Sequence, residues 1–170
     1  MLEEEIMKSI IEVSGRASSK LKDYAASVAL NCIKCMSQPD KLEVAIKFVS
    51  EKEIQKINLE HRGIDKVTDV LSFPAVDLKV GEILDLDDEE NIYLETDNGL
   101  IHFGDMAICL AQLKRQAKEY DVSIEEELKK LVIHSMLHFM GYDHIKDVDY
   151  EIMNKKEMVL DSLIKVKVDK

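Results

Sequence analysis

The chain of 170 residues has the length of one ordinary domain, and its 46% of hydrophobic residues can form a sizeable core. Charged residues make up 34%, a composition unlike that of a wholly disordered chain, and no apolar run approaches the roughly 20 residues of a membrane span. The 34 acidic and 23 basic residues give a formal net charge of −11, which at first sight disfavours a polyanionic partner such as nucleic acid.

Hydrophobic periodicity predicts alternating strands and helices in the first half of the chain. Ser50 and Glu53 form a capping box, because each side chain can satisfy the other's free backbone amide at the start of a helix. Pro74 lacks an amide proton and ends the strand before it. The pattern predicts strands at 6–13, 44–49 and 67–73, and helices at 18–36 and from 51 to about 61.

The acidity is concentrated in residues 80–99, which we interpret as a loop or hairpin excursion. Eight acidic residues and no Lys or Arg lie between Glu82 and Asp97. Without them, 26 acidic residues stand against 23 basic ones, a balance of −3. The rest of the surface can therefore present a basic patch, and the net charge does not exclude nucleic acid. Asn98-Gly99 is a strong turn signal within this segment.

The second half of the chain is predicted to be mainly helical after one strand at 100–109. A helix at 110–120 follows, and a second capping box at Ser123 and Glu126 begins a helix that stops at Gly141. A last helix covers roughly 147–164. With no internal repeat or linker, we expect a single α+β domain over residues 1–170, with a mixed sheet of four to five strands packed against helices.

Two features indicate a cytoplasmic location. The first residues, Met1 to Glu5, are acidic where a signal peptide would be basic and then apolar. The three cysteines have no framework spacing, which favours a reducing compartment. We expect no membrane association.

Three of the five histidines lie within eleven residues, at His134, His138 and His144. The first two are four residues apart on a helix and share one face. A left-handed Gly141 can end that helix and let the chain return His144 to the same point. Three converging imidazoles predict one Zn²⁺ per chain, held at the end of a helix with the fourth position open to water.

The alternative is that these are ordinary surface or core histidines. In residues 131–140, the only polar side chains are those of His134, Ser135 and His138. Burying an imidazole without a partner costs about 1–3 kcal/mol, and a metal ion removes that cost. The surroundings therefore favour metal binding.

Metzincin proteases have the same histidine spacing, but they place a glutamate base directly after the first histidine. This chain has Ser135 there, which is a poor base without an activating partner. Peptide hydrolysis is disfavoured, although a metallopeptidase that uses Asp143 or another residue as its base stays an alternative.

Three blocks of the chain resemble the YbeY family of bacterial ribosomal-RNA maturation factors. Residues 134–144 match its H-G/S-x-L-H-L/F-x-G-Y-D-H motif, residues 58–74 are similar to its segment ending in T-D-V-L-S-F-P, and residues 104–108 to its G-D-I-x-I strand. The chain departs from the family at His61, commonly an aromatic residue, and at Met106, commonly isoleucine. The acidic excursion is also longer than expected.

The resemblance implies a metal-dependent endoribonuclease that is specific for single-stranded RNA and processes the 3′ end of small-subunit ribosomal RNA. It implies that Arg62, His134, His138 and His144 are catalytic, with Arg62 in a loop before the Thr68–Phe73 strand. The partners would be precursor ribosomal RNA and the small subunit or its assembly factors, not DNA. An alternative is an assembly factor that binds RNA without cutting it and holds structural zinc; such a site normally has four protein ligands.

Two further sets of residues are weaker candidates. Asp105 is a candidate partner for a ligand histidine. Five cationic residues could form a basic rim for RNA: Lys114, Arg115, Lys118, Lys129 and Lys130.

Overall fold

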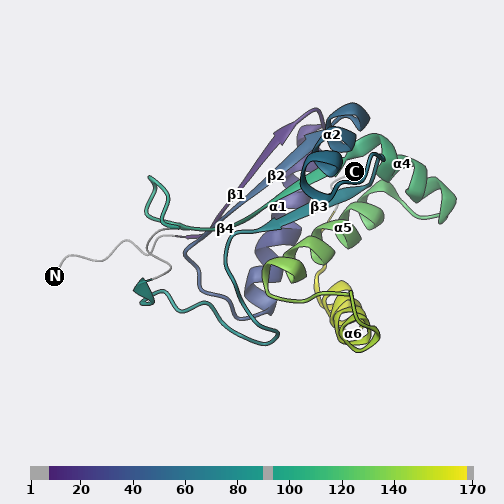
Figure 1. The fold of residues 1–170 in the computed structure, drawn as a ribbon. Coiled ribbons are helices and arrows are strands. Elements are labelled where there is room, and N and C mark those ends of the chain that lie inside the picture. The colour runs from purple at the N-terminus through teal and green to yellow at the C-terminus, as the bar shows by residue number, and fades with distance from the viewer. Residues whose placement is uncertain (1–7, 90–93, 168–170) are drawn as a thin grey trace.

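The computed structural model describes residues 8–89 and 94–167. Its centre is a four-stranded sheet in the order β1-β2-β4-β3 (Figure 1). Strands β1, β2 and β4 run parallel, and β3 is antiparallel to β4 at one edge. The strands are β1 (Ile10–Gly15), β2 (Leu42–Val49), β3 (Val70–Pro74) and β4 (Ile101–Cys109). The expected α+β class with a mixed sheet is confirmed.

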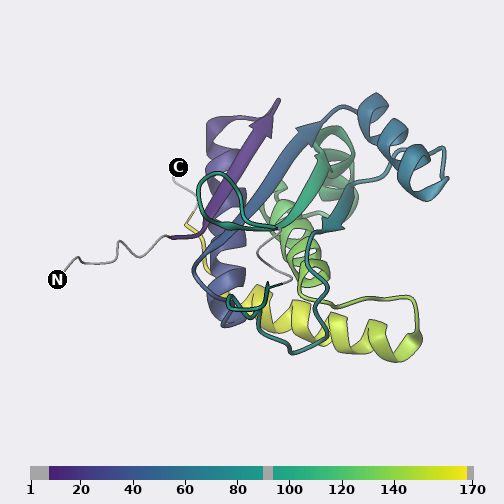
Figure 2. The same ribbon diagram turned by 60° about the vertical axis from the view of Figure 1, so that its left-hand side comes forward.

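Five helices surround the sheet in the described part of the chain. They are α1 (Ser19–Cys35), α2 (Glu51–Arg62), α4 (Leu110–Glu119), α5 (Ile124–Phe139) and α6 (Asp147–Leu163). Helices α1 and α5 pack on each other and on the sheet, whereas α6 packs on α5 and α1 (Figure 2). None of the described helices is both long enough and apolar enough to cross a membrane.

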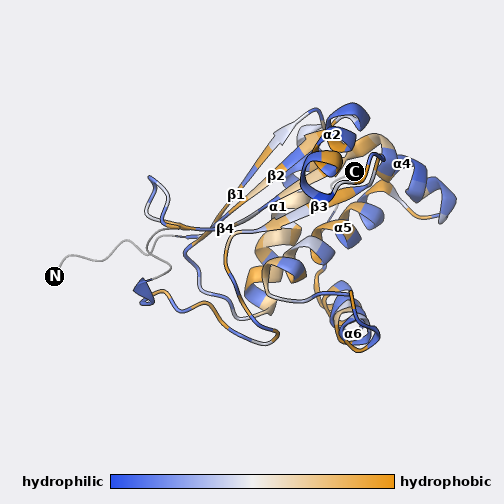
Figure 3. Ribbon diagram, viewed as in Figure 1, coloured by the Kyte–Doolittle hydropathy of each residue, from blue (hydrophilic) through white to orange (hydrophobic). Residues whose placement is uncertain are grey.

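The apolar residues form two clusters on opposite sides of the sheet. The larger one lies between the sheet, α1 and α5, and the apolar colouring of these helices faces inward (Figure 3). The smaller one includes Ile54 of α2 and Leu71 of β3. Helix α5 is buried on most of its surface, because the sheet, α1, α4 and α6 all contact it. This central helix carries two of the three clustered histidines.

Most predicted boundaries agree with the structure to within a few residues. Strand β1 begins at Ile10, later than predicted, and predicted residues 6 and 7 lie outside the described residues. Strand β3 begins at Val70 rather than Val67, after an Asp69 whose carboxylate accepts the Val70 amide at 2.7 Å. Pro74 sits at the end of this edge strand, where a missing amide proton is tolerated.

The acidic excursion is partly a hairpin, as predicted. Glu95 forms an antiparallel bridge with Ile101, and Gly99 closes the turn at φ 71° by donating its amide to the Thr96 carbonyl at 2.8 Å. Residues 90–93 of the predicted excursion lie outside the described residues. The earlier part is held by Gln38 of the α1–β2 connection, whose side chain donates to the Glu82 carbonyl and accepts from the Leu84 amide.

Candidate metal centre and adjoining pocket

Helix α5 is fixed at both ends by the local signals read from the sequence. The Ser123 hydroxyl accepts the Glu126 amide at 3.1 Å, and the Glu126 carboxylate accepts the Ser123 amide at 2.8 Å. At the other end, Gly141 adopts φ 86°. A Cβ at this glycine would lie 2.0 Å from the Leu78 carbonyl oxygen, so only glycine fits between the helix end and the loop after β3.

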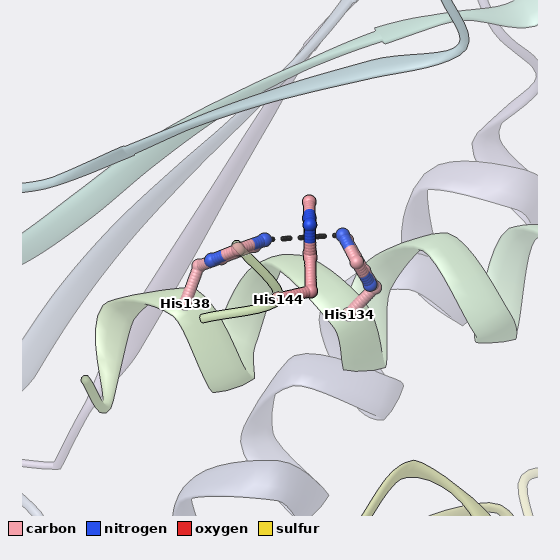
Figure 4. Close-up of side chains that lie close together, drawn as sticks. All are labelled: His134, His138 and His144. Carbon is pink, nitrogen blue, oxygen red and sulfur yellow. Dashed lines mark hydrogen bonds between the residues drawn. The ribbon is translucent and has the colours of Figure 1, made fainter. Parts of the chain in front are cut away.

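The turn after Gly141 brings the three histidines together (Figure 4). One ligand nitrogen from each of His134, His138 and His144 lies within 4.8 Å of the others. The Nε2 atoms of His134 and His138 are 3.1 Å apart. His134 and His138 are half-buried, and His144 is exposed. The three rings therefore face one point in space, as predicted from their spacing.

The chemistry of these donors fits a metal cation. Burial and the neighbouring His134 and His144 lower the pKa of His138 to about 4, so this imidazole is neutral and able to ligate at physiological pH. The Nδ1 atom of His134 lies 2.6 Å from a Glu157 carboxylate oxygen, which leaves its Nε2 lone pair directed at the cluster. Among the described residues, this cluster has no fourth protein ligand.

Glu157 was missed by the sequence analysis. It belongs to α6, and nothing in the predicted range of that helix indicated that it would lie beside the histidines. The available signal was its place between buried Met153 and Leu160 on the inward side of that helix, where a carboxylate requires a partner. Asp105, the predicted partner, instead contacts His102 at 2.9 Å and does not reach the site.

Ser135, at the position of the metzincin base, is fully buried. Its hydroxyl accepts a hydrogen bond from the Ser72 hydroxyl of β3 at 2.8 Å. The contact ties α5 to the edge strand.

Arg62 is the last residue of α2, and not part of a loop as expected. Gly63 ends the helix at φ 69°. Arg62 and all three histidines line one pocket of about 310 Å³. Arg62, His138 and His144 also line a neighbouring hollow of about 480 Å³ on the side of the Gly141 turn. The guanidinium has no hydrogen-bond or ion-pair partner within residues 8–89 and 94–167.

Comparison with known proteins is decisive at this point. A family model described as endoribonuclease YbeY matches residues 7–164. A Clostridioides difficile relative described as endoribonuclease YbeY is 37% identical over 147 residues, covering 86% of this chain and 85% of the relative. A Finegoldia magna relative with the same description is 40% identical over 153 residues, covering 87% and 89%. The chain belongs to the YbeY family.

The fold is also similar to a solved structure. The solution structure of TM1509 from Thermotoga maritima matches with a TM-score of 0.59 and 26% sequence identity, covering 90% of this chain and 87% of that one. The family model and the two relatives confirm the resemblance noted from the three sequence blocks.

One residue at which the chain departs from the YbeY family motif packs beside the site. His61, where the family commonly has an aromatic residue, makes an edge-to-face contact with Phe73 at 5.0 Å between ring centroids. The imidazole thus occupies a packing position next to Arg62. Asp143, the alternative base, accepts the backbone amide of His144 at 2.7 Å and so fixes the position of that histidine.

The five residues of the suggested basic rim do not line the pocket of the histidines together. Arg115 is ion-paired with Glu51, and Lys129 with Asp161. Lys114 lines a separate hollow near β1 and β2. Of the five, only Lys130 lines the pocket of the histidines, and its ammonium lies 5.1 Å from the centroid of the Tyr120 ring.

Proposed function

We propose that this protein is a zinc-dependent endoribonuclease that hydrolyses phosphodiester bonds of single-stranded RNA during ribosomal-RNA maturation. The observation that carries the proposal is the convergence of three histidine ligand atoms at a pocket that Arg62 also lines. The name of the YbeY relatives, endoribonuclease, supports the reaction class.

Each residue of the site has a distinct part in this reaction. His134, His138 and His144 would hold the metal, and Glu157 keeps the His134 ring turned toward the other two. When bound, a dication with an open position supplies a water of lowered pKa and polarises a phosphoryl oxygen. Arg62 binds the phosphate through its planar pair of donors and offsets the charge that develops there.

The form of the two hollows supports an unpaired RNA strand as substrate. They meet at Arg62, His138 and His144, so a chain can pass from one hollow to the other across the histidines. The pocket of about 310 Å³ is at the lower limit for a small-molecule site, which favours one nucleotide over a stacked duplex.

Membership of the YbeY family supports a proposal for the biological setting. We propose precursor ribosomal RNA, including the 3′ end of the small-subunit RNA, as substrate, the small subunit or its assembly factors as partners, and the cytoplasm as location. Zinc is proposed because three imidazoles and an open position are typical of catalytic zinc.

A panel of substrates tests the proposal. Purified protein loaded with zinc is incubated with single-stranded RNA, duplex RNA, single-stranded DNA and peptides, with and without a chelator. We expect cleavage of single-stranded RNA alone, loss on chelation and recovery with Zn²⁺. Tight RNA binding without cleavage would favour an assembly factor with structural zinc, and peptide cleavage would favour a metallopeptidase.

A further inference from the structure

The pocket continues beyond the histidines to a second group of polar side chains, from α4 and α5. We propose that Glu127 and Gln116 form a base-binding subsite, which receives an unpaired guanine adjacent to the scissile phosphate. This inference rests on the proposed function and adds a sequence preference to it.

Glu127 is the first observation. Glu127 is only 3% exposed, yet it lines the pocket. Within the described residues, its carboxylate has neither a hydrogen-bond donor nor an ion pair within 4 Å, and burial raises its pKa. Its carboxylate oxygens are not among the fully buried polar atoms, so they are open to the pocket, where a ligand can supply the donor that the protein does not.

Gln116 is the second, independent observation. Its Oε1 atom is buried and has no hydrogen-bond partner in the described part of the chain, and the residue lines the same pocket. Two polar side chains from different helices, each with an acceptor that lacks a donor among the described residues, thus line one pocket. Tyr120, with Lys130 5.1 Å from its ring centroid, adds an aromatic surface at this end.

The position suits the base of a nucleotide whose phosphate lies at the histidines. Glu127 and His134 are seven residues apart, which places them on the same side of α5, about 10 Å apart along its axis. A nucleotide that extends from the metal centre along α5 would present its base edge to Glu127.

The donor pattern selects guanine. The Watson–Crick edge of guanine carries two adjacent donors, N1–H and the N2 amino group, which match the two oxygens of a carboxylate. Uracil offers one donor between two acceptors, and adenine and cytosine each place an acceptor beside their amino group. Only guanine supplies two donors to Glu127, with the second N2 hydrogen free for Gln116.

Another explanation for Glu127 is stabilisation of the N-terminus of α5, whose first turn is acidic. Glu125 belongs to the same turn but does not line the pocket. Glu125→Gln therefore removes the same kind of helix stabilisation without changing the subsite, and it is the matched control for Glu127→Gln.

The test uses zinc-loaded full-length protein and single-stranded RNA oligonucleotides that contain one guanine, with inosine, adenine or uridine at that position in matched copies. Inosine lacks only the N2 amino group. We expect cleavage beside guanine to exceed cleavage beside the other bases about ten- to hundredfold, the range for a bidentate base contact. The preference should disappear in Glu127→Gln, weaken in Gln116→Ala and persist in Glu125→Gln.

Fluorescence anisotropy with the same oligonucleotides separates the two proposals. Tighter binding of guanine RNA without cleavage would contradict the proposed nuclease and support the subsite. Equal cutting and binding of all four oligonucleotides by the wild type would overturn the subsite and leave the nuclease intact. The inosine comparison needs no variant, so it holds even if Glu127→Gln fails to fold.

Discussion

The two ends of the pocket differ in how their polar groups are satisfied. At the histidine end, the imidazoles contact one another, and Glu157 engages the outward nitrogen of His134. At the other end, Glu127 and the Oε1 atom of Gln116 accept no hydrogen bond from any described residue. At the histidine end, imidazole lone pairs held in place by neighbouring side chains can bind a cation. At the other end, the oxygens of Glu127 and Gln116 can accept hydrogen bonds from a ligand. One pocket thus combines a pre-oriented metal centre with a site that is completed by its ligand.

The largest effect is expected from breaking the histidine end. His138→Ala removes a ligand, and the remaining two imidazoles should not retain the metal. We expect metal content measured by elemental analysis to fall from one ion per chain to near zero, with loss of RNA cleavage. His102→Ala is the control, because His102 pairs with Asp105 outside the site. Full occupancy in the His138 variant would contradict the assignment of the centre.

Arg62 lies where the two hollows meet, and its removal should affect chemistry rather than folding. The side chain is exposed and makes no described ion pair, so Arg62→Ala should melt near the wild type. We expect RNA cleavage to fall by about 100-fold, as for other single donors to a developing anion. Exposed Lys66 provides a control substitution nearby. Unfolding of Arg62→Ala would instead indicate a structural role.

Glu157 tests the support of the histidine end, because it contacts the outward nitrogen of His134 and is not itself a ligand of the proposed metal. Glu157→Ala should weaken metal binding by about 10- to 100-fold, and Glu157→Gln, which keeps one acceptor, should weaken it less. Competition with a chromophoric chelator measures the change without reference to activity. Glu151→Gln on the exposed side of α6 should have no effect. An unchanged affinity in Glu157→Ala would show that His134 needs no support.

The smallest effect is expected at Ser135, behind the histidines. Ser135→Ala leaves the Ser72 hydroxyl without its acceptor and should reduce the free energy of unfolding by about 1 kcal/mol, measured by urea denaturation. Metal content and most nuclease activity should be retained. Because the two hydroxyls share one bond, the loss in the Ser72→Ala/Ser135→Ala double variant should be smaller than the sum of the single losses. A covalent adduct trapped on Ser135 would contradict this prediction.

The convergence of the three histidines could be predicted because its determinants are local in sequence. A four-residue helical spacing, a glycine at the helix end and a third histidine just beyond it place three side chains together with little help from the rest of the fold. Both capping boxes form as predicted for the same reason. The error at Arg62 was also local, since Gly63 directly after it marks the helix end more closely than the predicted end at about His61.

The other end of the pocket could not be predicted, because it depends on how helices pack. Gln116 and Glu127 come from α4 and α5, and neither has a spacing that marks it as paired with the other. Glu157 reaches His134 only after α6 docks on α5. In each case, the only sequence signal for the contact was a polar residue at a position of the helix that faces inward.

The hydrogen bond between Glu157 and His134 makes the C-terminal helix part of the metal-binding equilibrium. By thermodynamic reciprocity, any free energy that this bond adds to metal affinity is added equally to the docking of α6. Amide hydrogen exchange in α6 should therefore slow when zinc is supplied, and unchanged exchange would refute the coupling. The supply of metal would then control both the reactive centre and the fraction of time that α6 is docked on the core.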